Sequence, residues 1–386
     1  MAATDTPPVA GRDQHDRDRQ DDLAGWLRLQ LTPGLGPVGA RRLLARFGLP
    51  GHIFAAGIDA LRACVAGPLA AVLAAPAAAP IARQTERTLE WLARSGSVSG
   101  PAPAHTVLTL ADADYPPKLL EIADPPLLLY VVGRRALLAR AALAVVGSRN
   151  ASAQGVANAE AFAEALSRAG LTIVSGLALG IDAAAHRGGL RGAGSSVAVI
   201  GTGADIVYPR GNGALTRLIA EQGCIISEYA LGVTALPFNF PRRNRLISGL
   251  ADGVLVVEAA ARSGSLITAR VAADQGRDVF AIPGSIHSAL AKGCHALIKQ
   301  GAKLVESADD VLQELRLPAP QTRADAAPDE SVHPALLAAL GHDPVGADAL
   351  AARAGLDAAG VLGQLLHLEL AGLVERLPGG LFQRID

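Results

Sequence analysis

The stretch GVLVVEAAARSGSLITA, residues 253–269, begins as an apolar strand, passes through a loop with Gly and Ser, and ends in a helical pattern. Short, near-continuous apolar strands that alternate with helices are typical of a parallel sheet covered on both faces. We therefore expect an α/β domain, doubly wound and of extended Rossmann-like form, over residues 106–316. Five other stretches have the same pattern: LAVVGSR (143–149), LTIVSGLA (171–178), SVAVIGTG (196–203), CIISEYA (224–230) and DVFAIPG (278–284).

The pattern changes on both sides of this predicted domain. Residues 1–20 are rich in mixed charge and are expected to form a disordered tail, and residues 21–105 read as a small helical domain with a Gly/Ser/Pro linker. Residues 317–331 form a Pro/Ala linker. Three helical segments and a hairpin pattern follow over residues 332–386, which is the order of elements in a winged helix.

Composition excludes several classes of protein. The 386 residues carry a net charge of −1, so a polyanion site must be a local patch. No apolar run reaches the roughly 18 residues that a membrane span needs, and the N-terminus has no apolar core of a signal peptide, so we expect a cytoplasmic protein. Cys64, Cys224 and Cys294 lie far apart and share no CxxC, which argues against a disulfide framework or a zinc site. Nothing in the sequence calls for a cofactor.

Small residues gather where the predicted strands end. Ligands of open parallel sheets bind beyond the carboxyl ends of the strands. Glycine lets the backbone approach a ligand there, and the free N–H groups of a helix's first turn bind anions. For any single loop, a tight strand-to-helix turn remains the simpler explanation. The candidate positions are Gly147, Ser148, Ser175, Gly176, Gly201, Gly203, Ser263, Gly264 and Ser265.

Arginines next to these loops indicate which kind of ligand they would bind. Arg149 directly follows one strand, and Arg242, Arg243 and Arg245 precede another within a run flanked by apolar residues. Guanidinium groups bind phosphate in bidentate fashion and stay charged. Several arginines distributed over two loops suit a polyphosphate or a nucleic-acid backbone better than a single phosphate. The sequence does not decide which of the clustered arginines face the ligand.

Motifs for catalysis are few. The segment GLGPVG (34–39) matches a dinucleotide fingerprint but lies outside any βαβ unit. It reads better as a helix-hairpin-helix turn, in which Arg41 or Arg42 would touch a phosphate if the turn is not purely structural. Asp182 and His186 share one helix face, either as an acid–base couple or, as we prefer, as a helix-stabilising pair. We assign no catalytic and no metal-binding residue.

The motifs of residues 106–316, in their order, resemble one family. DADYPPKLLEIADPPLLLYVVG (112–133), LAVVGSR, SGLALGIDAAAH, GTGADIVYP, FPRRNRLISGL, SGSLITA, VFAIPG and KGCHALIKQGA are similar to the DNA-processing protein A (DprA/Smf) family of bacterial transformation proteins. The flanking segments fit as well, since such proteins often carry a helical N-terminal domain and a C-terminal winged helix.

The resemblance implies a protein that binds single-stranded DNA without sequence preference. It also implies a homodimer that loads the RecA recombinase onto incoming DNA, past single-strand-binding protein, in natural transformation. The implied basic pocket contains Arg149 with Arg242, Arg243 and Arg245. The residues that would support it are Asn244, Ser248, Glu258, Ser263, Gly264, Ser265 and Thr268.

The resemblance has further consequences outside the pocket. Dimerisation at the end of the Rossmann domain points to Leu290, Leu297 and Ile298, and packing of this helix on its own sheet is an equal alternative. The presumed recognition helix of the winged helix has no Lys or Arg, so we predict a protein-contact or autoregulatory role for that domain. Aromatic residues are few. Tyr208, Phe238 and Phe240 are the nearest candidates for contacting a base, and we expect core packing for each instead.

The alternative function is an enzyme. Nucleotide phosphoribohydrolases of the "lonely guy" type are similar in architecture and use a Gly-rich strand end with a basic pocket and a Glu. In that case Glu258 would act as a base toward a nucleoside. The corresponding loop here, ARSGSLIT (261–268), lacks the double Gly of the PGGxGT motif, which favours binding over catalysis.

Overall fold

The computed structural model describes residues 10–95, 103–317 and 333–385, with the side chains of residues 10–19 excepted. The predicted linkers fall largely outside this range, since residues 96–102 and 318–332 are not described. The chain forms two compact units, one from residues 1–140 with 197–250 and the other from residues 141–196 with 251–386.

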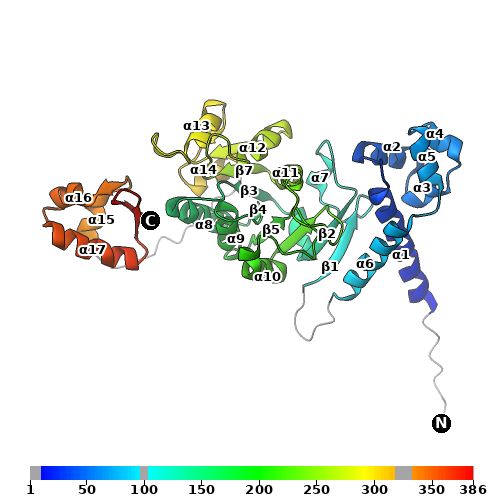
Figure 1. Ribbon diagram of the computed structural model, residues 1–386, viewed down its shortest axis with the longest axis horizontal. Helices are drawn as coiled ribbons and strands as arrows, with labels where there is room; N and C mark the ends of the chain where they lie inside the picture. Colours follow the sequence, from blue (N-terminus) through cyan, green and yellow to red (C-terminus); the bar gives the residue numbers. More distant parts are fainter. Residues whose placement is uncertain (1–9, 96–102, 318–332, 386) are drawn as a thin grey trace, which may run out of the picture. The chain divides into compact units, whose positions relative to one another are not determined.

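The first unit starts with a group of helices. Helix α1 begins at Ala10, inside the segment predicted as a tail, because a helix extends at little cost once its packed half has formed. Helices α1 and α6 run side by side and bury Trp26, Leu27 and Trp91 (Figure 1). The helices of this group are α1 (Ala10–Leu31), α2 (Pro37–Phe47), α3 (Pro50–Ala55), α4 (Ile58–Arg62), α5 (Gly67–Ala74) and α6 (Ala79–Ala93).

Four strands of the first unit follow one another in the order β1, β2, β6, β5. β1 and β2 pair antiparallel, as do β2 and β6, whereas β5 and β6 pair parallel. Thus β5 and β6 direct their carboxyl ends to the same edge. The elements are β1 (His105–Thr109), α7 (Pro117–Leu120), β2 (Leu128–Gly133), β5 (Ser196–Val199), α10 (Gly213–Gln222), β6 (Cys224–Ser227) and α11 (Asn239–Gly249).

The second unit contains five parallel strands in the order β4, β3, β7, β8, β9. Leu143, Val145 and Leu255 pack against α8, α9 and α14 on one face, while Val254 and Val256 are buried on the other. Burial on both faces confirms the doubly wound α/β class. The elements are β3 (Ala142–Val146), α8 (Ala153–Arg168), β4 (Thr172–Ser175), α9 (Ile181–Leu190), β7 (Gly253–Val256), α12 (Ser265–Asp274), β8 (Asp278–Ala281), α13 (Lys292–Lys299), β9 (Lys303–Leu304) and α14 (Ala308–Glu314).

The C-terminal residues form the expected winged helix around their own core of Leu336, Leu350, Leu365 and Phe382. Strand β12 pairs with both β10 and β11. The order of three helices and a hairpin agrees with the sequence pattern. The elements are α15 (Pro334–Leu340), β10 (Val345–Gly346), α16 (Ala347–Ala354), α17 (Ala358–Leu370), β11 (Val374–Leu377) and β12 (Leu381–Arg384).

Candidate nucleic-acid interface

In the second unit, the loop after β3 presents Arg149 to solvent. Gly147 is required here by close packing, since a Cβ at this position would lie 2.6 Å from Ile181 Cγ1. The carbonyl of Ser148 accepts a hydrogen bond from the Ile181 N–H at 3.1 Å, which fixes the loop against the start of α9. The backbone is therefore rigid directly before Arg149.

The loop from β4 to α9 is held by buried side chains. Ser175 donates its hydroxyl to the carbonyl of Val145 at 2.7 Å, and Asp182 accepts from the Gly176 N–H at 3.2 Å. His186, fully buried, accepts from the Leu177 N–H through Nε2. Ser175 and Gly176 are themselves buried, and Asp182 with His186 shapes the loop rather than facing a substrate.

Glu258 lies at the end of β7, but its carboxylate is occupied. Oε1 accepts from the Ser152 hydroxyl at 2.5 Å and Oε2 from the Ser152 N–H at 3.0 Å. The Ser152 oxygen in turn caps α8 by accepting from the Gly155 N–H. A carboxylate held this way stabilises the N-terminus of α8, and the geometry gives no support to a role as a base.

The loop before α12 contributes less exposed surface than expected. Ser265 and Thr268 are buried, and the hydroxyls of Ser263 and Ser265 lie 2.7 Å apart. Gly264 is exposed, and a Cβ there would meet no atom within 4 Å. Of the four residues predicted here, only Gly264 and the half-buried Ser263 offer groups to a ligand.

In the first unit, Gly201 and Gly203 follow β5 and are both buried. A Cβ on Gly201 would lie 3.1 Å from the Phe240 ring, and one on Gly203 would lie 2.7 Å from the Ala230 carbonyl oxygen. The glycines at these two positions permit close approach between segments of the protein. Nothing in their surroundings exposes their amides to a ligand.

The basic run, treated in the sequence as a loop, is the helix α11, which tolerates Pro241 because proline fits in a first helical turn. Arg243 therefore points away from Arg242 and Arg245, which lie on one face of the helix. Arg243 is 4% exposed and donates to the Val199 carbonyl. Arg245 is 14% exposed and pairs with Glu228, whereas Arg242 is 49% exposed.

The supporting residues of α11 face inward as well. Asn244 accepts from the Arg243 Nε at 3.3 Å, and Ser248 is buried and donates to the Asn244 carbonyl. Burial raises the pKa of the Glu228 carboxyl, and the guanidinium groups of Arg245 and Arg242 oppose that shift. Arg242 is thus the residue of this helix whose charge faces solvent.

Two aromatic residues do not serve the core, contrary to expectation. Phe238 is 68% exposed and Tyr208 is 44% exposed. The Tyr208 ring lies 5.6 Å from that of Phe240, centroid to centroid. The sequence offers these residues as candidates for contacting a base but favours core packing, because nothing in it shows which of these side chains lie on the surface.

The sequence of residues 106–316 matches the family described as DNA recombination-mediator protein A, and residues 318–380 match the DprA winged helix domain. The chain belongs to the DNA recombination-mediator protein A family. It is 44% identical to protein Smf of Escherichia coli over 308 residues, which covers 77% of this chain and 80% of that protein. It is 51% identical to DNA processing protein DprA of Streptococcus pneumoniae over 206 residues, 53% of this chain and 73% of that protein.

Two solved structures of DprA proteins are similar to this one. The S. pneumoniae protein has a TM-score of 0.59 at 39% identity, covering 74% of this chain and 95% of that chain. DNA processing protein A of Helicobacter pylori, whose structure concerns its mode of binding single-stranded DNA, has a TM-score of 0.50 at 29% identity, covering 55% of this chain and 96% of that chain.

The structure also places the residues predicted for dimerisation and for the helix-hairpin-helix turn of this DprA family member. Leu290, Leu297 and Ile298 are half-buried around α13. In the helix-hairpin-helix turn, Arg41 is engaged by Asp124, and the neighbouring Arg42 is exposed. The described residues contain no helix able to cross a membrane and no cluster of three or more potential metal ligands.

Proposed function

We propose that this protein binds single-stranded DNA without sequence preference through Arg149 in one unit and Arg242 in the other. The observation that carries the proposal is that these two arginines are the exposed members of the predicted set, in a chain of the recombination-mediator family. The H. pylori relative's single-stranded DNA binding supports it. Contacts to phosphates through guanidinium groups read no bases, which accounts for the absence of sequence preference.

We propose further that the bound strand is passed to the RecA recombinase on incoming DNA, in competition with single-strand-binding protein. The family's description as a recombination mediator supports this step. A homodimer through Leu290, Leu297 and Ile298 is proposed because all three keep part of their apolar surface exposed. We propose binding without catalysis, because both oxygens of the Glu258 carboxylate accept hydrogen bonds from Ser152 at the start of α8.

The test is the affinity for an oligothymidylate, followed by fluorescence anisotropy over a range of salt concentrations. The double variant Arg149→Ala/Arg242→Ala should bind more than about tenfold more weakly, because each charged contact contributes roughly 1–3 kcal/mol. The slope of log K against log salt should become shallower by about 1.4, since each phosphate contact on a single strand contributes about 0.7.

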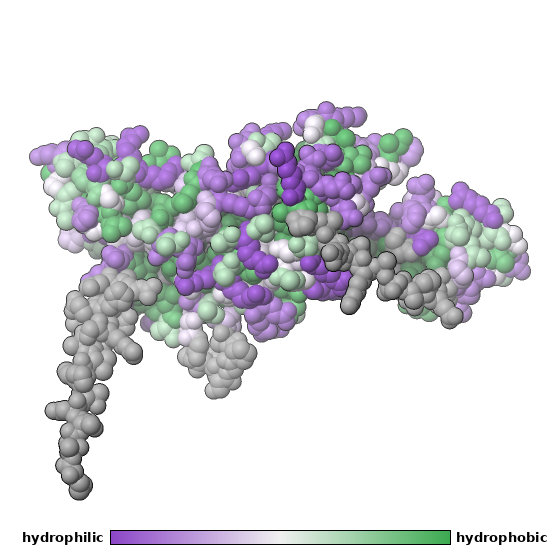
Figure 2. Space-filling model, turned by 180° about the vertical axis from the view of Figure 1, so that it is seen from behind, coloured by the Kyte–Doolittle hydropathy of each residue, from purple (hydrophilic) through white to green (hydrophobic). Residues whose placement is uncertain are grey.

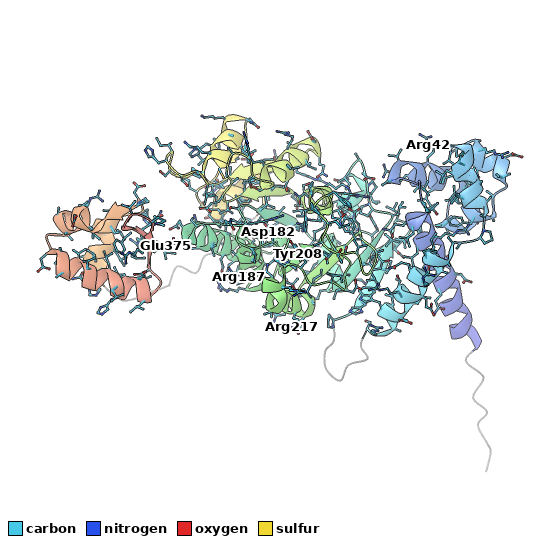
Figure 3. All side chains as sticks on the ribbon, viewed as in Figure 1. Arg42, Asp182, Arg187, Tyr208, Arg217 and Glu375 are labelled. Atoms are coloured by element: carbon cyan, nitrogen blue, oxygen red, sulfur yellow. The ribbon has the colours of Figure 1, made fainter. Side chains whose placement is uncertain are left out.

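The matched control is Arg46→Ala/Arg217→Ala. It removes two exposed arginines, one from α2 and one from α10, where Figure 3 shows Arg217, and no contact to DNA is proposed for either. It should keep near wild-type affinity and slope. Equal affinities of the two double variants would contradict the proposal, because only net charge would then matter.

A further inference from the structure

Five charged side chains of the first unit alternate in sign between α2 and α11. Arg41 Nη1 lies 2.5 Å from Asp124 Oδ1, and Asp124 Oδ2 lies 3.5 Å from Arg245 Nε. Arg245 Nη2 lies 2.5 Å from Glu228 Oε2, and Glu228 Oε1 lies 3.6 Å from Arg242 Nε. We refer to these five side chains as the charge chain. It connects the N-terminal helices with the arginine that faces solvent.

The charge chain is buried in its middle, at Glu228 and Arg245, and exposed to solvent at Arg242. The side chain of Glu228 is 5% exposed and that of Arg245 is 14%, against 49% for Arg242. Charges interact more strongly where water is excluded. The contact between Arg245 and Glu228 is therefore firm, whereas Arg242 is exposed to solvent and its charge is accessible to a ligand.

The two carboxylate oxygens of Glu228 make different contacts. Oε2 accepts a hydrogen bond from Arg245, whereas Oε1 is buried and has no hydrogen-bond partner among the described residues. At 3.6 Å, Arg242 Nε is attracted to Oε1 without forming a hydrogen bond. Arg242 is thus oriented by Glu228 while its terminal nitrogens make no hydrogen bond within the described part of the chain.

The N-terminal helices also hold the backbone on which the charge chain is built. Gln30 of α1 donates through Nε2 to the main-chain carbonyl of Glu228 at 2.8 Å. Arg41 of α2 donates through Nη2 to the carbonyl of Ala123 at 2.9 Å. These helices therefore hold the carboxylate of Asp124 directly and that of Glu228 through its backbone.

We propose that the N-terminal helices position Arg242 for DNA through the charge chain, with Arg41, Asp124 and Glu228 as positioning residues. The inference rests on the proposed function, in which Arg242 contacts the phosphate. Without Arg41, Asp124 attracts Arg245 more strongly and Arg245 withdraws from Glu228. The carboxylate of Glu228 then draws Arg242 into a full hydrogen bond, with which a phosphate must compete.

The test is a double-mutant cycle on oligothymidylate affinity. Arg41→Ala should weaken binding about fivefold, which corresponds to a coupling of about 1 kcal/mol. Arg46→Ala, the matched loss of one charge from an exposed position of α2, should change affinity less than about twofold, as expected for a surface charge. In the Arg242→Ala background, Arg41→Ala should have no further effect. Asp124→Asn removes the charge that would draw Arg245 away from Glu228, so it should restore near wild-type affinity when combined with Arg41→Ala.

A second readout separates positioning from contact. Arg41→Ala should keep the wild-type salt slope because it removes no phosphate contact, whereas Arg242→Ala should make the slope shallower. Equal effects of Arg41→Ala and Arg46→Ala, or an Arg41→Ala effect that persists without Arg242, would overturn the inference and leave the proposed function standing. If Arg242→Ala alone changes nothing, the contact itself is wrong and both fail.

Discussion

At the scale of single residues, burial decides which groups are available for chemistry. Cys224 and Cys294 are fully buried, whereas Cys64 is partly exposed. Burial raises the pKa of the Cys294 thiol to about 11 and raises that of Cys224 as well. Since the thiolate is the reactive form, these two cysteines are protected twice, by exclusion of reagent and by protonation.

Iodoacetamide at pH 8 should therefore modify one thiol per folded chain, at Cys64, as measured by intact mass. A raised pKa keeps the thiol protonated below that value, so labelling of Cys294 should increase only as the pH approaches about 11. The Cys64→Ser variant should remain unlabelled when folded, and both forms should label fully in denaturant. Rapid addition of two or three labels to the native protein would show that the core opens more readily than its packing implies.

The exposed arginine could not be identified from the sequence for a reason that belongs to this scale. Successive residues of an α-helix are rotated by about 100°, so Arg243 points away from Arg242. Arg242 and Arg245, three positions apart, lie on one face beside Glu228, and they differ in how deeply they are buried. Arg243 meets the Val199 carbonyl and Arg245 meets Glu228, partners more than ten positions away in the chain. The sequence shows that the cluster exists, and only tertiary structure shows that Arg242 is its exposed member.

At the scale of elements, the strands were predictable because burial on both faces leaves an uninterrupted apolar run. The segments around Val145, Ile173, Val254 and Phe280 all form strands as expected. The role of Glu258 was not predictable, because its partner Ser152 lies 106 positions earlier. From the sequence alone, a carboxylate at this position could serve in an active site or bind at the start of a helix. In the fold, it binds Ser152 at the start of α8.

The contact between Ser152 and Glu258 joins the start of α8 to the end of β7. Ser152→Ala should destabilise the protein by about 1–2 kcal/mol, because it removes an N-cap and a partner of the carboxylate together. Thermal unfolding followed by circular dichroism should show the lower melting temperature. Ser148→Ala serves as the control, since its side chain accepts only one hydrogen bond, from the Asn150 N–H at 3.2 Å.

The same pair allows a test of coupling. If Ser152 acts through Glu258, Ser152→Ala should destabilise the Glu258→Gln variant less than it destabilises the wild type. Fully additive losses would mean that the cap to Gly155 accounts for the whole effect, and that the Glu258 carboxylate contributes nothing to α8.

At the scale of the whole molecule, charge is distributed unevenly although the net charge is only −1. Residues 333–385 contain three arginines against five carboxylates. Helix α17 places Leu362, Leu366 and Leu370 on its exposed side, and hydrophobic residues reach the surface of this domain at the right of Figure 2. An acidic domain with leucines on its presumed recognition helix is suited to a protein contact and unsuited to a phosphate backbone.

The winged helix should therefore contribute little to DNA affinity. Arg376 lies in the wing, exposed, with its guanidinium 5.9 Å from the centre of the Phe382 ring. Arg376→Ala/Arg384→Ala should change oligothymidylate affinity less than about twofold, whereas two true phosphate contacts would each cost roughly 1–3 kcal/mol. The measurement is the same anisotropy titration at several salt concentrations, beside Arg149→Ala/Arg242→Ala. A tenfold loss with a shallower salt slope in the winged-helix variant would assign DNA contact to this domain, and the leucines of α17 would then need another explanation.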